Sequence, residues 1–175
     1  MKHVALLRGI NVGGKNIVSM KDLAALFTAA GCRDVTTYIQ SGNVIFTAPA
    51  PVLKKLPAAI SNAYGVPAVI RSQEELAAAV RGNLYLAEGV DPIDPKTLHI
   101  MFLAGRPSAS AVAALEPDRS PPCRFHVKGQ DIYLHLPSGV AKTKITNAWI
   151  DSKLSTVSTM RNWTTVLKLL ELTRT

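Results

Sequence analysis

The sequence has few cysteines and no long apolar segment. Only two cysteines occur, Cys32 and Cys123, and neither belongs to a C-x-x-C pair or to a spacing typical of metal ligands. We expect both to be reduced and structural, with Cys32 the more reactive because Arg33 follows it. The apolar opening at residues 4–7 is interrupted by Arg8, so it is too short for a signal peptide or a membrane span. These absences favour a cytoplasmic protein that does not enter the membrane.

Aromatic residues and recognisable catalytic groups are also scarce. Aromatics make up 6% of the chain, and the aromatic-rich signature of ferredoxin-like RNA-recognition domains is missing. No Ser/His/Asp ordering and no pair of carboxylates typical of acid–base catalysis can be recognised. His126 and His135 are expected to share a face of one hairpin, but no third ligand stands at a known spacing. The sequence therefore predicts no metal site, and it leaves cofactors and catalytic residues unassigned.

Acidic residues are outnumbered by basic ones. The chain has 20 Lys and Arg against 12 Asp and Glu, a formal net charge of +8. The excess lies at both ends, with five basic against two acidic residues in 1–50 and ten against five in 101–175. Such a balance favours anionic partners, either a phosphorylated small molecule or nucleic acid, although a solvated basic surface gives the same count. With 175 residues, 47% of them hydrophobic, the chain can form one large domain or two subdomains.

The most informative segment that is present runs from Arg8 to Asn16, RGINVGGKN, between a predicted strand and a predicted helix. Gly9, Gly14 and Lys15 fall one residue short of the nucleotide-binding P-loop, because Asn16 stands where a Ser or Thr hydroxyl would hold magnesium. No strand-end Asp supports a metal either, so magnesium-dependent nucleotide hydrolysis is not expected. Backbone N–H groups of a glycine loop attract anions without a metal. The alternative is that two glycines merely turn the chain and Lys15 is solvated.

Apolar periodicity predicts the order β-α-β-β-α-β over the first 71 residues, which is the split-βαβ, ferredoxin-like order. The first helix begins with a capping-box pattern at Ser19 and Asp22. Ser41-Gly42 has the length and chemistry of a two-residue hairpin turn. The expected elements are strands at 2–8, 35–40, 43–47 and 66–71, and helices at 19–31 and 51–64, the second interrupted near Pro57.

The same order recurs after a helix at 72–80 and a connector rich in Gly, Asp and Pro at 88–95. We therefore predict an α+β protein of two ferredoxin-like βαββα halves with antiparallel sheets and C-terminal helices, although no sequence repeat supports the duplication. Residues 1–87 form the N-terminal half with its linking helix, and residues 96–175 form the C-terminal half with its closing helices. Its expected elements are strands at 97–103, 124–128 and 131–136, a helix at 108–115 and two final helices.

Topology predicts which loops meet. In the ferredoxin-like order, the exit of the first strand and the hairpin at 41–42 lie at the same edge of the sheet. Across a two-residue turn Gln40 faces Asn43, which places two amides beside the glycine loop. Such amides either bind a polar ligand or tie the loop backbone together.

The C-terminal segment is interpreted in two ways. Trp163 begins an apolar stripe at helical spacing, which indicates a core position. Arg161 and Asn162 are expected in the first turn of that helix, where a cation is unfavourable unless it serves an anion. Lys144, like Lys142, precedes another helix and either joins a basic rim or is solvated. The predicted ligand-binding residues are Arg8, Asn11, Gly13, Gly14, Lys15, Gln40, Ser41, Asn43, Lys144, Arg161 and Asn162.

The run LRGINVGGKN at 7–16, followed by YIQSGNV at 38–44, resembles the bacterial family known as domain of unknown function 1697. The segments KTKIT at 142–146 and RNWTTV at 161–166 are similar to that family's closing motifs. The resemblance spans nearly the whole chain and implies a compact α+β bacterial protein with ferredoxin-like elements. It supplies no reaction, substrate or catalytic residue.

Three classes of function follow from the sequence. We expect a protein that binds a phosphorylated or other anionic small molecule at the glycine-rich loop. The alternatives are a nucleic-acid-binding protein and an enzyme of unassigned reaction that uses the same pocket. The oligomeric state is left open.

Overall fold

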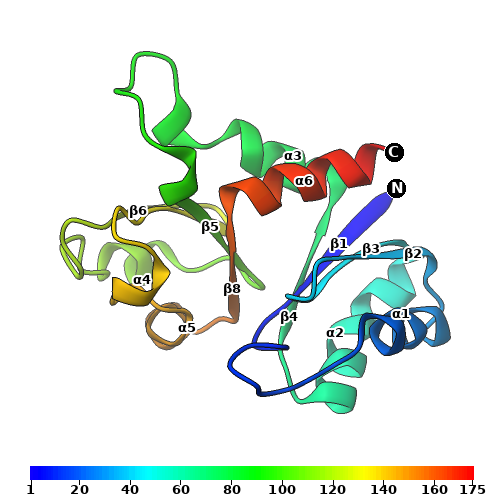
Figure 1. The fold of residues 1–175 in the computed structure, drawn as a ribbon. Coiled ribbons are helices and arrows are strands. Elements are labelled where there is room, and N and C mark those ends of the chain that lie inside the picture. Colours follow the sequence, from blue (N-terminus) through cyan, green and yellow to red (C-terminus); the bar gives the residue numbers. More distant parts are fainter. The chain divides into compact units, whose positions relative to one another are not determined.

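The computed structural model describes residues 1–175 and contains two four-stranded antiparallel sheets with helices (Figure 1). Spatial grouping of the residues gives two compact units. The first consists of Met1–Ala77 and Lys168–Thr175, and the second of Ala78–Leu167. The predicted α+β class with two ferredoxin-like halves is therefore confirmed.

The first unit has the complete ferredoxin-like order. Its sheet runs β2-β3-β1-β4, and each neighbouring pair is antiparallel. Helix α3 begins in this unit and ends in the second. The elements are β1 (Lys2–Leu7), α1 (Met20–Ala29), β2 (Arg33–Tyr38), β3 (Asn43–Thr47), α2 (Ala50–Tyr64), β4 (Ala68–Ser72) and α3 (Gln73–Arg81).

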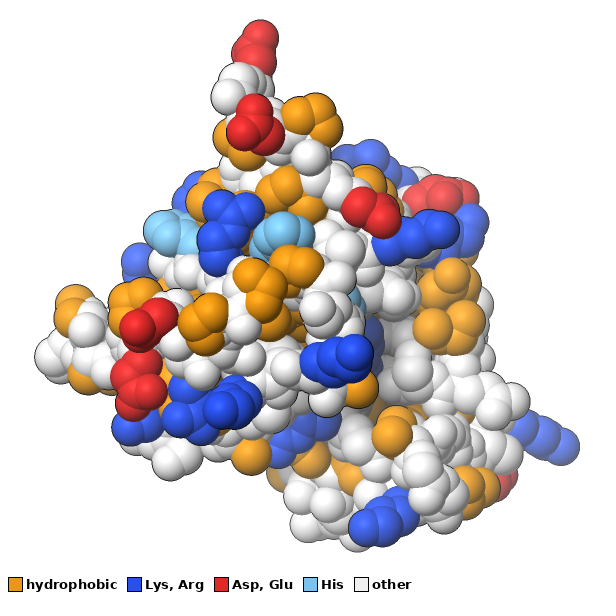
Figure 2. All heavy atoms as spheres, turned by 60° about the vertical axis from the view of Figure 1, so that its left-hand side comes forward, with side chains coloured by type: hydrophobic (Ala, Val, Ile, Leu, Met, Phe, Trp, Pro, Cys, Tyr) orange, Lys and Arg blue, Asp and Glu red, His pale blue; other side chains and the backbone are white.

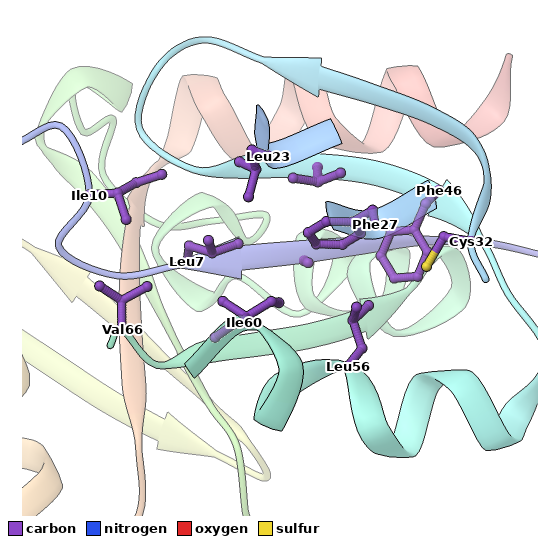
Figure 3. Close-up of a cluster of buried hydrophobic side chains, with 12 residues drawn as sticks. Leu7, Ile10, Leu23, Phe27, Cys32, Phe46, Leu56, Ile60 and Val66 are labelled. Atoms are coloured by element: carbon purple, nitrogen blue, oxygen red, sulfur yellow. The ribbon is translucent and has the colours of Figure 1, made fainter. Parts of the chain in front are cut away.

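The core of the first unit lies between its sheet and the helices α1 and α2 (Figure 3). Phe27 of α1 meets Phe46 of β3 edge to face, with 5.2 Å between ring centroids. Leu23 and Ile60 are fully buried beside them. Ser19 caps α1 as predicted, because its hydroxyl accepts a hydrogen bond from the Asp22 amide at 3.0 Å. Ile10, from the loop after β1, also enters this core and anchors that loop.

The other face of the first sheet is buried too. Register places Val4, Leu6, Ile45 and Val69 on this face, and all four side chains are buried. The part of α6 that belongs to this unit, from Lys168 onward, also buries Leu169 and Leu170. The apolar side chains of β1, β3 and β4 on this face are therefore not available for stacking a ligand.

The second unit repeats the topology, with strand order β6-β7-β5-β8 and antiparallel neighbours. Met101, Ile132 and Trp149 are among the buried residues between its sheet and helices. The Tyr133 hydroxyl, on the other face, donates to the Ala79 carbonyl at 2.7 Å and so ties the end of α3 to this sheet. The elements are β5 (Leu98–Leu103), α4 (Ala109–Ala113), β6 (Arg124–Lys128), β7 (Asp131–His135), α5 (Asn147–Leu154), β8 (Ser158–Asn162) and α6 (Trp163–Arg174), with short 3-10 turns at Leu84–Leu86, Pro95–Thr97 and Val140–Lys142.

Three local predictions are wrong. Strand β2 ends at Tyr38, which faces Asn43, so the turn comprises residues 39–42 and Gln40 faces no residue across the hairpin. Helix α2 continues through Pro57, because the buried stripe of Leu56 and Ile60 holds the helix against the sheet. Residues 158–162 form a strand rather than the start of the last helix.

The duplication extends to particular side chains, which the sequence analysis did not predict. His3 lies opposite Ser72 in the first sheet, and His99 lies opposite Asn162 in the second. Arg71 and Arg161 occupy matching positions in β4 and β8, and each donates to the carbonyl of the residue before it. The next residue in each unit caps the following helix, with Ser72 accepting from the Glu75 amide and Asn162 from the Thr165 amide.

Candidate functional site

The glycine-rich segment forms a small hairpin rather than a loop that runs into a helix. Val12 and Lys15 form an isolated antiparallel bridge, and the Lys15 amide donates to the Val12 carbonyl at 3.1 Å. Gly13 and Gly14 between them have φ values of +58° and +72°, as the tight turn with two left-handed residues requires. Helix α1 begins only at Met20. The segment therefore differs from a P-loop, in which the helix N-terminus follows the lysine directly.

Asn11 fastens this hairpin to its surroundings. Its Nδ2 donates to the carbonyl of Val18 at 2.9 Å and to that of Gln40 at 2.8 Å, while its Oδ1 accepts from the Val18 amide at 2.8 Å. Asn16 closes the hairpin from the other side by donating to the Gly9 carbonyl at 2.9 Å. The predicted meeting of the first loop with the β2–β3 turn is thus confirmed, and the Asn11 amide serves to hold the two together.

The β2–β3 turn contributes close packing to the same place. The Leu7 amide donates to the Gly42 carbonyl at 2.8 Å. Gly42 has a φ of +87°, and a Cβ atom there would lie 2.9 Å from the Cβ of Leu7. Asn43 is fully buried and donates to the Tyr38 carbonyl at 3.1 Å and to the Ser41 hydroxyl at 3.0 Å. Asn43 and Ser41 therefore shape the turn from within.

The outer surface of the hairpin and turn is both basic and apolar. Lys15 and the backbone of Gly13 and Gly14 are exposed, and Arg8 at the base is half-buried. The exposed fractions are 61% for Val12, 73% for Ile17 and 50% for Ile39. No acidic residue occurs before Asp22. We call the exposed surface of residues 12–17 together with the turn at 39–42 the hairpin surface.

The second unit provides a comparison for this segment. Both units join their first strand to their first helix with a glycine and a serine cap, Gly9 and Ser19 in one and Gly105 and Ser108 in the other. Residues 8–18 make this connection in the first unit, whereas residues 104–107 suffice in the second. The fold therefore does not require the additional length that forms the hairpin.

The C-terminal site candidates all lie in the second unit. Arg161 is buried in β8, where its guanidinium donates to the Thr159 hydroxyl and the Met160 carbonyl, both at 2.8 Å. Burial lowers the pKa of Arg161 to about 10. Asn162 is the cap of α6, and Lys144 is exposed while its amide donates to the Ser120 hydroxyl at 3.0 Å. The expected first-turn positions of Arg161 and Asn162 are wrong, because β8 ends with these two residues.

The histidines and cysteines have structural surroundings. Both cysteines are buried and free, and burial raises the pKa of the Cys32 thiol, which disfavours the reactive thiolate there. His126 and His135 share a face of their hairpin with Arg124, whose Nη2 lies 3.3 Å from the His135 Nδ1. Burial, and then Arg124, lowers the pKa of His135. No three His, Cys, Asp or Glu side chains are grouped closely enough to hold a metal ion.

Two further features concern the chain as a whole. Figure 2 shows Lys and Arg side chains on one face of the molecule in several separate groups rather than in one continuous patch. No helix combines the length and the apolar character that crossing a membrane requires.

Comparison with known proteins agrees with this architecture. A family described as "Protein of unknown function (DUF1697)" matches residues 1–133, so the chain belongs to that family. No curated protein matches the chain. A solved structure, that of the conserved bacterial protein SP0830 from Streptococcus pneumoniae, is similar with a TM-score of 0.69 and 22% sequence identity, covering 98% of both chains. At this identity the likeness shows a shared fold.

Proposed function

We propose that the chain is a binding protein whose hairpin surface recognises an anionic small molecule that also carries an apolar group. Lys15 supplies the positive charge, the exposed backbone of Gly13 and Gly14 supplies N–H donors, and Val12, Ile17 and Ile39 supply apolar contact. The observation that carries the proposal is that the second unit makes the same strand-to-helix connection with residues 104–107 alone, without a hairpin.

Under this proposal, the asparagine side chains that the sequence predicted as ligand contacts have a different role. Asn11 and Asn43 hold the hairpin and turn in shape through bonds to backbone and to Ser41, so they act by positioning. Arg8 lies at the base of the hairpin, where its charge adds to the local positive potential. We place the protein in the bacterial cytoplasm, where two buried free thiols remain reduced.

Amide-resolved NMR tests the proposal. The ¹⁵N-labelled protein is titrated with inorganic phosphate and, separately, with phenyl phosphate, which adds an apolar group to the same anion. We expect saturable shifts at Gly13, Gly14 and Lys15, with tighter binding of phenyl phosphate. Lys15→Ala should weaken binding by roughly tenfold or more, because a charge-assisted hydrogen bond contributes about 1.5–3 kcal/mol.

Lys21 is the matched control, since it is an exposed lysine on α1 outside the hairpin surface. Lys21→Ala should bind phenyl phosphate as the wild type does. Equal affinity of Lys15→Ala and wild type would remove Lys15 from the site. Retention of RNA in a gel shift that Lys15→Ala abolishes would favour the nucleic-acid alternative.

A further inference from the structure

The second unit has long connections of its own that the first lacks. Residues 114–123 join α4 to β6, whereas residues 30–32 make the equivalent connection in the first unit. Residues 136–146 join β7 to α5, whereas residues 48–49 suffice between β3 and α2. The ferredoxin-like order therefore requires neither long segment.

The two long segments are fastened together and position one tryptophan. The Lys144 amide donates to the hydroxyl of the buried Ser120 at 3.0 Å, which joins one segment to the other. Thr146 then caps α5 by accepting from the Trp149 amide at 3.2 Å. The guanidinium carbon of Arg119, on the first segment, lies 5.1 Å from the centre of the Trp149 ring. This is a cation–π stack.

Two donors in this stack have no acceptor. The indole Nε1–H of Trp149 and the Nε–H of Arg119 are both buried, and neither has a hydrogen-bond partner. Trp149 is 8% exposed, so the indole is more than nine-tenths buried. A buried N–H without an acceptor costs roughly 1–3 kcal/mol, and native proteins normally supply an acceptor from the chain, from water or from a ligand.

The ion pair of Arg119, the side chain that stacks on Trp149, is weak. Arg119 pairs with Glu116 at 3.8 Å, and the two side chains are 35% and 54% exposed. Exposed pairs of this kind contribute about 0–1 kcal/mol, so a small shift of Arg119 is inexpensive. Lys142 and Lys144 are exposed on the other segment, and Asp118 beside Arg119 is the remaining acidic residue of the first segment. The two segments together therefore carry three basic residues against two acidic ones.

We propose that the Arg119–Trp149 stack is a binding site for a small oxyanion, a carboxylate or a phosphate, whose oxygens accept from the indole N–H of Trp149 and from the Nε–H of Arg119. Arginine suits this role because one planar group both stacks on the indole and donates in fixed directions. The site lies within the second unit and is independent of the hairpin surface.

The indole signals of the ¹⁵N-labelled full chain test the proposal directly. The chain has two tryptophans, so Trp149→Phe identifies the Trp149 indole by its disappearance, and the Trp163 indole serves as an internal reference. Acetate and inorganic phosphate are titrated separately, which distinguishes the two kinds of oxyanion. We expect a saturable downfield shift of the Trp149 indole proton with at least one of them and no shift of the Trp163 indole.

Arg119→Lys keeps the charge but removes the Nε donor, and we expect it to weaken binding at least tenfold. Arg106→Lys is the matched control, since Arg106 is exposed and lies outside both long segments. Lys15→Ala should leave this titration unchanged, which separates the site from the hairpin surface. A Trp149 indole that shifts with neither anion would overturn the proposal and leave water as the acceptor. Equal affinity of Arg119→Lys and wild type would also overturn it, because general charge attraction would then explain the shift.

Discussion

The two units share one topology and differ in which of their connecting segments are long. The first carries its excess between β1 and α1, and the second carries it between α4 and β6 and between β7 and α5. Each unit thus shows which connections the ferredoxin-like fold needs and which it does not. The additional length in each unit is held by specific hydrogen bonds, at Asn11 in the first and at Ser120 in the second, and both of our proposals concern these segments.

The comparison also separates unusual residues from functional ones. A buried arginine such as Arg161 suggests an anion site when it is considered alone. Its counterpart Arg71 is buried at the matching position and makes the same contact with its own strand. A feature present in both units is more simply explained by the fold, so Arg161 is left out of our proposed sites.

Substitution of the first residue of α3 and of α6 should give the largest difference in stability between equivalent positions of the two units. Trp163 begins α6 and is buried, whereas Gln73 begins α3 and is half-buried. Trp163→Ala should lower the free energy of unfolding by about 3–5 kcal/mol, because a large buried aromatic is lost. Gln73→Ala should change it by less than about 1 kcal/mol. Urea denaturation of both variants gives the comparison, and a Trp163→Ala protein as stable as wild type would contradict the core assignment.

The glycines in the two β hairpins should also differ in how much stability is lost when each is replaced by alanine. A Cβ at Gly42 would lie 2.9 Å from the Leu7 Cβ, whereas a Cβ at Gly129 has no neighbour within 4 Å. Both glycines have positive φ, at +87° and +64°. Gly42→Ala combines a clash with backbone strain and should cost about 3 kcal/mol, while Gly129→Ala has the strain alone and should cost about 1 kcal/mol. Thermal unfolding of the pair checks this, and equal losses would show that strain dominates.

Within the hairpin, Asn11 and Asn16 should contribute unequally to the stability of the protein. Asn11 makes three side-chain hydrogen bonds that join separate segments, and Asn16 makes one within the hairpin. At about 1 kcal/mol for each bond, Asn11→Ala should cost about 2–3 kcal/mol and Asn16→Ala about 1 kcal/mol. Amide hydrogen exchange should show faster exchange at residues 39–42 in Asn11→Ala only. Unchanged exchange there would mean that the turn is held without Asn11.

The smallest effect concerns the equivalent histidines His3 and His99. Burial is the main cause that lowers the pKa of each, and His99 is buried where His3 is half-buried. A lowered pKa means that the unfolded chain binds the proton more readily, so stability falls as the pH drops below about 6.5. Between pH 7 and pH 5 the wild type should therefore lose stability. His99→Gln should reduce this pH dependence more than His3→Gln, as urea midpoints at the two pH values will show.

Much of this fold follows from local patterns in the sequence. The serine cap at Ser19 and the apolar stripe of the first helix predict the element they border, and the cap is observed. Strand β8 was missed because its sequence, STMRN, lacks apolar alternation, and its pairing with β5 determines its conformation. Helix α2 shows the opposite conflict, since packing overrides the proline that suggests a break.

The sites depend more strongly on three-dimensional proximity. Topology was sufficient to predict that the first loop meets the β2–β3 turn, but not that Asn11 makes the connection with its side chain. The stack of Arg119 on Trp149 joins residues from separate segments, and no spacing in the sequence predicts it. Aligning the two halves by His3 with His99 and Arg71 with Arg161 exposes the extra segments, and this signal is present in the sequence.

The division of helices α3 and α6 between the two units has a consequence for the order in which each unit is synthesised. Each begins in one unit and ends in the other, and Lys168–Thr175 belong to the first unit although they follow the whole of the second. During synthesis, residues 1–77 therefore emerge long before the helical segment that completes them. The first unit therefore receives its last helical segment only after the whole of the second has been translated.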